Sequence, residues 1–341
     1  MGAAQGGDGL IAVEHLCCPA CRARILTAPD GTSLYCRECG RAYPYNGDFA
    51  DFVESAALDE FAAWQRDIYN GKVASQHVPG YLQPEAVMRH NAMCLEVAER
   101  YGLLSPSWLG LSFREATDRL KPRRGETVLD VGCSTGIILN AMKAIYGIRG
   151  VGIDFSREAI AAGAAWNPMG NEYHVADALC LPFAEASFDI AVSYGVIEHV
   201  SSPAGMVSEM VRVLKPGGRM LIYTTCRRDM FTWHWWQRLT SGGKYNLGRD
   251  NLAGHDRDKF LLPQELSAIM EKAGLRRVET MVVHTLYTLI FDECYPGFLI
   301  RLLPHRGLFR AARKIFEIAD ALPSGLGFGN ELMAVAWKEE A

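Results

Sequence analysis

Two closely spaced cysteine pairs stand near the start of the chain. They are Cys18-Pro-Ala-Cys21 and Cys36-Arg-Glu-Cys39, and fourteen residues separate them. A C-x-x-C unit can form a tight turn that directs two sulfurs at one ion, and four thiolates make a closed tetrahedral zinc site. Such a site stabilises a segment that is too small to fold on its own core. We therefore expect a structural Zn²⁺ held by Cys18, Cys21, Cys36 and Cys39.

A second chemical signal is the run of small residues in Val128-Leu-Asp-Val-Gly-Cys-Ser-Thr-Gly136, which follows a short apolar strand. Small residues let the backbone approach a ligand closely, and a helix that opens after the turn presents free N–H groups to it. Several kinds of nucleotide-binding fold use such a turn. The segment alone therefore indicates a nucleotide-like ligand without naming it.

Acidic residues and further short motifs follow in order. Asp154 ends the second strand of this region, where a carboxylate would accept both hydroxyls of a ribose, and Asp177 ends the third. The segments Phe188–Tyr194, Val196–Val200 and Leu214–Gly218 come next. In order and spacing, this series resembles the class I S-adenosylmethionine-dependent methyltransferases, in particular the small-molecule branch that includes quinone- and sterol-methylating enzymes.

The resemblance covers about residues 120–283 and returns at 331–338. It implies an enzyme that transfers a methyl group from S-adenosylmethionine to oxygen, nitrogen or carbon of a small or medium-sized metabolite, with an apolar or lipid-linked acceptor as one form. A dehydrogenase-type nucleotide fold is the alternative. The glycine spacing of that fingerprint is absent, and the later motifs do not belong to it.

The resemblance also implies the cofactor contacts: a loop beneath the methionine part, a carboxylate at the ribose, and a carboxylate at the adenine amino group. Asp154 is the ribose carboxylate and Asp177 the adenine carboxylate. Ser134 replaces the middle glycine of the family's loop. The expected cofactor-binding set is Asp130, Gly132, Cys133, Ser134, Gly136, Asp154, Phe155, Asp177, Ala178 and Ser193.

Three residues are candidates for proton transfer. Methyl transfer is an in-line displacement, so the enzyme mainly supplies proximity and alignment, plus proton removal from a hydroxyl or an acidic carbon. His199 is the first candidate base, because histidine titrates near neutrality and the Glu-His-Val motif lies close to the cofactor in the family. The alternative is that His199 takes no part in proton transfer and only packs against the loop or forms a hydrogen bond with the backbone. Tyr194 and His255 are the further candidates.

The cysteine segment carries a resemblance of its own. With Gly40-Arg-Ala-Tyr43-Pro44, it resembles the zinc-ribbon (Trm112-like) module often placed before bacterial methyltransferases, including a ribosomal RNA guanine methyltransferase group. An RNA methyltransferase is therefore the alternative function. The net charge of −4 speaks against it, as does Ser193-Tyr-Gly-Val where an Asn/Asp-Pro-Pro-Tyr motif would stand. A binding protein without turnover is a third hypothesis, against which the intact Asp154 and Asp177 speak.

Short apolar strands must position these residues. From residue 126 they alternate with helices, which is typical of βαβ units and a parallel sheet. We predict an α/β fold: a Rossmann-like seven-stranded methyltransferase sheet with helices on both faces, a small N-terminal zinc ribbon and a helical lid. The expected strands span 127–132, 148–153, 172–176, 188–193, 218–225, 275–283 and 331–338.

The expected organisation has four parts, and two insertions within the last part are expected to hold the substrate. The parts are a flexible N-terminus (1–15), a zinc ribbon (16–53), a helical lid or linker (54–120) and the methyltransferase domain (121–341), with insertions at 226–262 and 284–330. The first insertion is aromatic and the second basic and amphipathic, so peripheral membrane contact is one interpretation. The first can equally pack a cap onto the domain, and a helix like that of the second more often covers the domain's own core or a dimer interface.

The composition limits the cellular compartments in which the protein is expected. No stretch approaches the roughly 18–20 apolar residues of a spanning helix, and the first residues do not read as a secretory signal. Five of ten cysteines crowd into positions 17 to 39, which favours a reducing compartment with one metal site over a disulfide framework. We expect a cytoplasmic protein with a small-molecule substrate.

Overall fold

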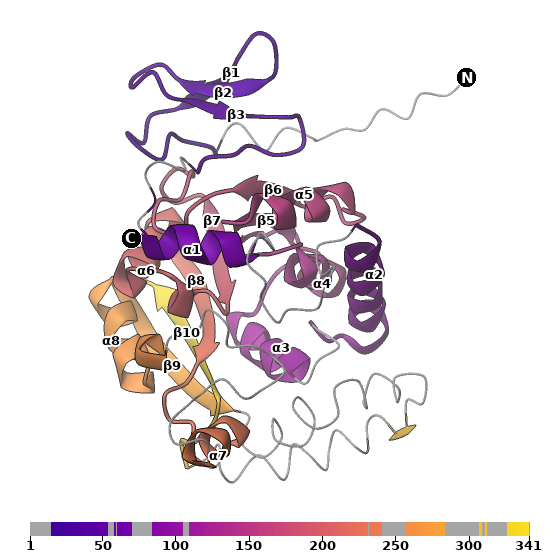
Figure 1. The fold of residues 1–341 in the computed structure, drawn as a ribbon, viewed down its shortest axis with the longest axis vertical. Helices are drawn as coiled ribbons and strands as arrows, with labels where there is room; N and C mark the ends of the chain where they lie inside the picture. The colour runs from indigo at the N-terminus through magenta and orange to yellow at the C-terminus, as the bar shows by residue number, and fades with distance from the viewer. Residues whose placement is uncertain are drawn as a thin grey trace.

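The computed structural model describes residues 15–53, 58, 60–69, 84–104, 109–230, 232–240, 257–283, 307–308, 311 and 326–340. These residues form two sheets, drawn in Figure 1. The smaller sheet is antiparallel and consists of β1 (Ile25–Thr27), β2 (Ser33–Cys36) and β3 (Ala42–Pro44). It joins the two cysteine pairs, and we call residues 15–53 the ribbon.

The larger sheet has seven strands, as the alternating pattern predicted. Across the sheet they are β6 (Glu172–Val175), β5 (Arg149–Asp154), β4 (Thr127–Val131), β7 (Phe188–Tyr194), β8 (Leu214–Thr225), β10 (Glu331–Lys338) and β9 (Leu275–Val283). β10 runs antiparallel to both of its neighbours, while the strands from β6 to β8 pair in parallel. The strand order reverses between β4 and β7, and in open α/β sheets ligands bind at the carboxyl ends of the strands beside such a reversal.

Alternate residues of the central strands enter two separate buried clusters. Leu129 and Ile222 belong to one cluster, and Val128 and Leu221 belong to the other. Successive side chains of a strand point to opposite faces, so the two clusters are the two faces of the sheet. Both faces are therefore covered, which explains why the central strands are apolar on both sides.

Helices from different parts of the chain cover the two faces. The first cluster includes residues of α6 and α8, and the second includes residues of α2, α3, α4 and α5. Their bounds are α2 (Pro84–Tyr101), α3 (Leu109–Leu120), α4 (Ile137–Tyr146), α5 (Arg157–Ala165), α6 (Pro203–Val213) and α8 (Pro263–Lys272). The remaining elements are α1 (Glu60–Tyr69), η2 (Ile197–His199), α7 (Trp233–Thr240) and η3 (Arg257–Lys259).

The region predicted as a helical lid includes α2, which packs on α4 and α5. Asn91 of α2 is 1% exposed, and its Nδ2 donates to the carbonyl oxygen of Thr135 at 3.1 Å. The Thr135 hydroxyl donates in return to Asn91 Oδ1 at 3.2 Å. This reciprocal pair ties α2 to the turn that precedes α4.

The ribbon shares a core with the larger domain. Leu34 of the ribbon and Phe183 of the domain belong to the same buried cluster. The ribbon's last residues extend the edge of the seven-stranded sheet, because Phe52 N donates to Val175 O at 2.8 Å and Val175 N donates to Ala50 O at 2.9 Å. The ribbon is thus packed on the domain at the β6 edge (Figure 1).

Candidate active site

The turn after β4 brings the backbone into an unusual conformation. Gly132 and Gly136 have φ angles of 83° and 80°, and Ser134 lies between them at 50°. A Cβ on Gly136 would lie 2.1 Å from the Tyr173 hydroxyl, so this position admits no side chain. Ser134 adopts a left-handed backbone conformation that is uncommon for a residue other than glycine, and its backbone N–H donates to Asp154 Oδ2 at 2.8 Å. The small residues therefore permit a tight turn beside the end of β5.

The helix α4 begins directly after this turn. Its N-cap is Gly136, and no side chain caps it. The first N–H groups of a helix have no partner within the helix and carry partial positive charge. The N-terminus of α4 is therefore able to receive an anionic or polar ligand group at the end of β4.

Asp130 lies on β4 just before the turn and is 1% exposed. Among the described residues, neither of its carboxylate oxygens has a hydrogen-bond donor. Burial, with the nearby charge of Asp154, raises the pKa of Asp130 to about 8. Burying a carboxylate without a hydrogen-bond donor raises the free energy of the folded protein. Asp130 is therefore a candidate contact for a bound ligand.

Asp154 ends β5 and is only partly buried. Its Oδ1 accepts from Ser156 N and its Oδ2 from Ser134 N, both at 2.8 Å. Burial raises the pKa of Asp154, and the backbone N–H groups oppose that effect. Each carboxylate oxygen keeps a further lone pair, so Asp154 can also accept two ribose hydroxyls. Phe155 follows it in the chain.

The loop after β6 carries Asp177 and Ala178. Asp177 Oδ1 accepts from Leu179 N at 2.8 Å, which fixes the start of the loop. Ala178 is 9% exposed. The carboxyl ends of β4, β5 and β6 lie side by side in the sheet, so the turn, Asp154 and this loop follow one another along one edge.

Ser193 lies inside the sheet. Its hydroxyl donates to the carbonyl oxygen of Val131 at 2.8 Å, and the residue is 0% exposed. This bond joins β7 to β4 where the strand order reverses. Cys133 is also buried, at 5%. Both predicted residues thus support the turn from within the protein, Ser193 through its bond to the carbonyl oxygen of β4.

Tyr194 is held against α3. Its hydroxyl and that of Thr117 are 3.1 Å apart, and its ring centroid lies 4.7 Å from that of Phe113. Burial raises the pKa of Tyr194. A phenol with a raised pKa is a poor base at neutral pH. The geometry therefore favours an anchoring role for Tyr194 over the predicted proton transfer.

Replacing Tyr194 with phenylalanine is expected to leave kcat nearly unchanged and to lower the free energy of unfolding by about 1–2 kcal/mol, because the buried Thr117 hydroxyl loses its partner. Denaturant unfolding and initial rates measure the two effects. A kcat reduced by about 100-fold would instead establish Tyr194 as an acid–base residue.

His199 lies on the short helix η2 that follows β7. Its backbone N–H donates to the backbone carbonyl oxygen of Val196 at 2.8 Å. The residue is partly exposed. The neighbouring Glu198 is 1% exposed, and its Oε2 accepts from Thr224 Oγ1 at 2.9 Å. η2 is therefore fixed to β8, which holds His199 near the end of β7. His255 lies outside the described residues.

The four predicted metal ligands lie together at one end of the ribbon. The sulfurs of Cys18, Cys21, Cys36 and Cys39 all lie within 4.8 Å of one another, with Cys18 and Cys39 at 3.5 Å and Cys21 and Cys36 at 3.4 Å. Four sulfurs around Zn²⁺ at bond lengths of about 2.3 Å are about 3.8 Å apart. The cluster is consistent with zinc. Cys17 does not belong to it, and its N–H donates to Pro182 O of the domain at 2.9 Å.

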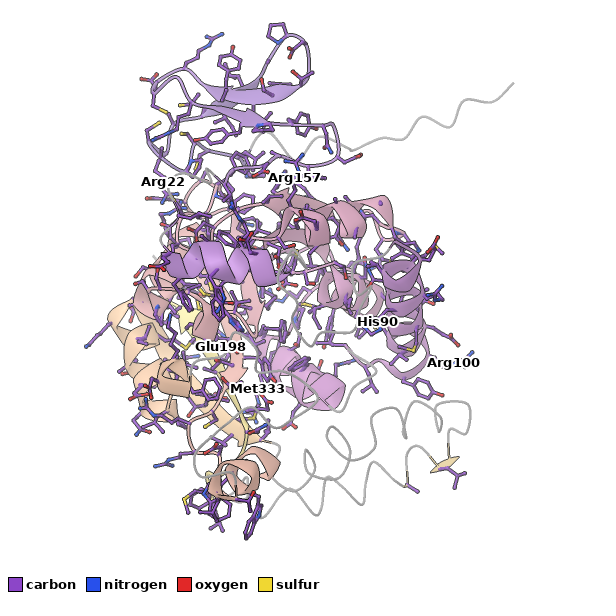
Figure 2. All side chains as sticks on the ribbon, viewed as in Figure 1. Arg22, His90, Arg100, Arg157, Glu198 and Met333 are labelled. Carbon is purple, nitrogen blue, oxygen red and sulfur yellow. The ribbon has the colours of Figure 1, made fainter. Side chains whose placement is uncertain are left out.

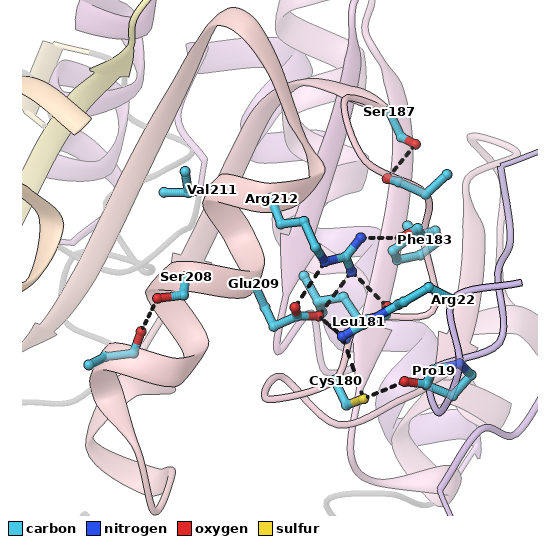
Figure 3. Close-up of polar contacts among 12 residues, drawn as sticks. Pro19, Arg22, Cys180, Leu181, Phe183, Ser187, Ser208, Glu209, Val211 and Arg212 are labelled. Carbon is cyan, nitrogen blue, oxygen red and sulfur yellow. Dashed lines mark hydrogen bonds and ion pairs between the residues drawn. The ribbon is translucent and has the colours of Figure 1, made fainter. Parts of the chain in front are cut away.

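The ribbon also holds the loop that carries Asp177. Arg22 donates through Nη1 to Leu181 O at 2.8 Å and forms an ion pair with Glu209 at 2.9 Å (Figure 3). Glu209 Oε2 in turn accepts from Leu181 N at 2.9 Å. Cys180 Sγ donates to Pro19 O of the ribbon at 3.0 Å. Figure 2 shows Arg22 and Arg157 between the ribbon and the domain, and Arg157 forms an ion pair with Asp51 at 2.7 Å.

Replacing Arg22 with glutamine is expected to raise the KM for cofactor several-fold while kcat stays nearly constant, because Leu181 loses one of its two arginine donors. The free energy of unfolding should fall by about 1 kcal/mol, since the ion pair is partly exposed. Arg24→Gln removes the same charge from an exposed position of the ribbon and serves as the control. An equal effect of both variants would reject the specific contact.

Little of the two insertions lies within the described residues. In the first, Trp235 and Trp236 of α7 have ring centroids 4.7 Å apart, and Trp236 is 45% exposed. In the second, only 307–308, 311 and 326–330 are described, so its basic stretch lies outside them. The expected substrate roles of both insertions remain predictions.

Two positioning residues were not among the predicted site residues. Asn91 occupies the apolar stripe of α2 with Val87 and Cys94, and a polar residue in such a stripe is a signal that could have identified it. Glu198 stands within the quoted Glu-His-Val motif, but its bond to Thr224 depends on the pairing of distant segments.

Comparison with known proteins adds two family matches. The family described as "Methyltransferase domain" matches residues 129–222, and the family described as "Trm112p-like protein" matches residues 13–44. The first match spans the turn after β4 and continues into β8. The second contains all four cysteines of the cluster.

Several curated proteins are similar to the chain. The ubiquinone biosynthesis O-methyltransferase of Bartonella tribocorum is 30% identical over 172 residues, which cover 50% of this chain and 68% of that protein. That of Thiobacillus denitrificans is 31% identical over 166 residues, covering 48% and 69%. The chloroplastic tocopherol O-methyltransferase of Arabidopsis thaliana is 34% identical over 125 residues, covering 35% and 36%.

Among solved structures, the chain is similar to a chain in the complex of the Haloferax volcanii Trm112 methyltransferase activator with a methyltransferase. It has 19% identity and a TM-score of 0.48, and the match covers 83% of this chain and 100% of that chain. A phosphoethanolamine N-methyltransferase 2 of Haemonchus contortus in complex with S-adenosyl-L-methionine has 20% identity and a TM-score of 0.49, with 83% and 61% covered.

Proposed function

Because this chain belongs to the S-adenosylmethionine-dependent methyltransferase family that includes the ubiquinone biosynthesis O-methyltransferases, we propose that it methylates a hydroxyl group of a small, ring-containing metabolite. The observation that carries this proposal is the 30% identity to an O-methyltransferase across two thirds of that protein's length. Ubiquinone and tocopherol, which appear in the names of these relatives, are ring compounds with a long hydrocarbon chain. An acceptor of this apolar class is therefore the first to test.

The residues around the turn fit the proposed cofactor. Bound S-adenosylmethionine supplies an electrophilic methyl group on a positively charged sulfur. In our assignment Asp154 accepts the ribose hydroxyls, the Asp177 loop borders the adenine, and Asp130 faces the cationic methionine part. The unpartnered oxygens of Asp130 and the uncapped start of α4 support this assignment.

His199 is the residue that we assign to proton removal. A neutral imidazole accepts a proton near pH 7, and a phenol becomes a much stronger nucleophile as its proton leaves. The bond between Glu198 and Thr224 supports the assignment because it holds η2 at the end of β7, beside the turn. Alignment of the acceptor oxygen with the methyl carbon supplies the rest of the rate enhancement.

In this proposal the parts of the chain have separate roles. We assign residues 121–341 to the catalytic domain, residues 16–53 to the zinc ribbon and residues 54–120 to the helical lid or linker. Within the described residues, no helix combines the length and the apolar character that crossing a membrane requires. A cytoplasmic location is part of this proposal, because four of the described cysteines lie where they could share one metal ion, and a reducing compartment keeps such thiols available.

Methyl incorporation tests the proposal. The purified chain is incubated with radiolabelled S-adenosylmethionine and a catechol, the same catechol with a prenyl tail, an arylamine, or total RNA. We expect label in the catechols, with a higher kcat/KM for the prenylated one. Label in RNA alone, resistant to added catechol, would replace this proposal with RNA methylation.

A further inference from the structure

Asp130 is set apart by its surroundings. It is 1% exposed, and its two oxygens have no donor among the described residues. The titratable groups that act on it or are acted on by it come from the neighbouring segments and are all acidic: Asp154 at the end of β5, Cys133 in the turn, Tyr173 on β6 and Tyr194 on β7. None of these four can supply a positive charge.

A carboxylate in such surroundings is unstable as an anion. Removal from water disfavours the charged form, and a second carboxylate nearby disfavours it further. Both effects raise the pKa of Asp130 to about 8. At neutral pH the protonated form of Asp130 would then predominate. The free protein therefore holds a neutral carboxylic acid at the base of its cofactor turn.

We propose that Asp130 is protonated in the free protein and gives its proton to the solvent when the cationic methionine end of the cofactor arrives. This inference rests on the proposed function, because the methyl donor supplies the ammonium group that replaces the proton. The Asp130 O–H bond breaks, the proton passes to buffer, and the resulting carboxylate pairs with the ammonium. One proton is released for each cofactor bound.

The direction of the pH dependence follows from this exchange. Below the pKa of the free protein, binding must remove a proton, so the affinity should rise about tenfold for each pH unit between pH 5.5 and 7.5. The neutral variant Asp130→Asn has no proton to release, and its affinity should be weaker and nearly independent of pH in this range.

Calorimetry measures the proton directly. The full-length protein is titrated with S-adenosylhomocysteine, which carries the same ammonium group, at pH 6.5 in two buffers of different ionisation enthalpy. The difference in heat should correspond to about one proton released by the unsubstituted chain. Asp130→Asn should bind without release, and Asn fills nearly the same volume as the neutral acid, so its thermal unfolding should report an intact fold.

Infrared spectroscopy gives a second measurement. The free protein should show the carbonyl band of a protonated carboxylic acid that disappears on ligand binding and is absent from Asp130→Asn. Normal binding without proton release would overturn the inference while leaving the proposed function in place. No binding of S-adenosylhomocysteine or S-adenosylmethionine would overturn the proposed function, and the inference with it.

Discussion

Replacing His199 with asparagine is expected to lower kcat by about 10²- to 10⁴-fold, which is the usual contribution of a positioned general base. Asparagine keeps a polar group of similar size but cannot accept a proton near neutral pH. The bonds that hold η2 involve the His199 backbone and the Glu198 side chain, so they should survive the substitution. Cofactor affinity should therefore change little.

Initial rates across pH and calorimetric titration with S-adenosylhomocysteine check both parts of this expectation. At saturating cofactor, which removes the effect of Asp130 on binding, a general base makes kcat rise with pH, because only the neutral imidazole accepts a proton. This rise in kcat should be lost in His199→Asn and kept in Tyr194→Phe. A His199→Asn variant with normal kcat would assign the residue to packing.

Replacing Cys18 with alanine is expected to remove the metal and unfold the ribbon. The three strands of the ribbon are three or four residues long, so their stability depends on the four sulfurs being held together. The ribbon shares its core with the domain and holds Leu181 through Arg22. We therefore also expect a lower melting temperature of the whole chain and weaker cofactor binding.

Metal analysis, thermal unfolding and hydrogen exchange of the loop at 176–183 measure these effects. The matched control is Cys17→Ala, which removes the neighbouring buried thiol but leaves the cluster complete. It should retain one zinc ion per chain. Equal metal loss in both variants would show that the ligand set is wrong, and an unchanged loop in the metal-free protein would show that the ribbon does not support it.

The sequence by itself determined the strands and the acidic positions at their ends. Short apolar runs between helical segments are recognised from the local sequence alone, so β4 to β10 lie close to where the pattern predicted them. The largest difference is at β8, which begins at Leu214 instead of residue 218, because the Gly-Gly turn continues directly into the pairing with β7; the ends of β4, β5, β6 and β7 differ by one residue. The two C-x-x-C units were equally clear, since their spacing alone limits the sulfurs to one small volume.

Tertiary structure decided what surrounds those residues. The sequence shows that Asp130 is acidic. Only the packed sheet buries its two oxygens without a hydrogen-bond donor and brings Asp154 close to it. Likewise, only the fold brings Arg22 to Leu181, 159 positions later in the chain, and turns the Tyr194 hydroxyl toward Thr117. Periodicity and motif spacing report short-range order, whereas pKa values, anchoring bonds and the docking of the ribbon depend on contacts between distant segments.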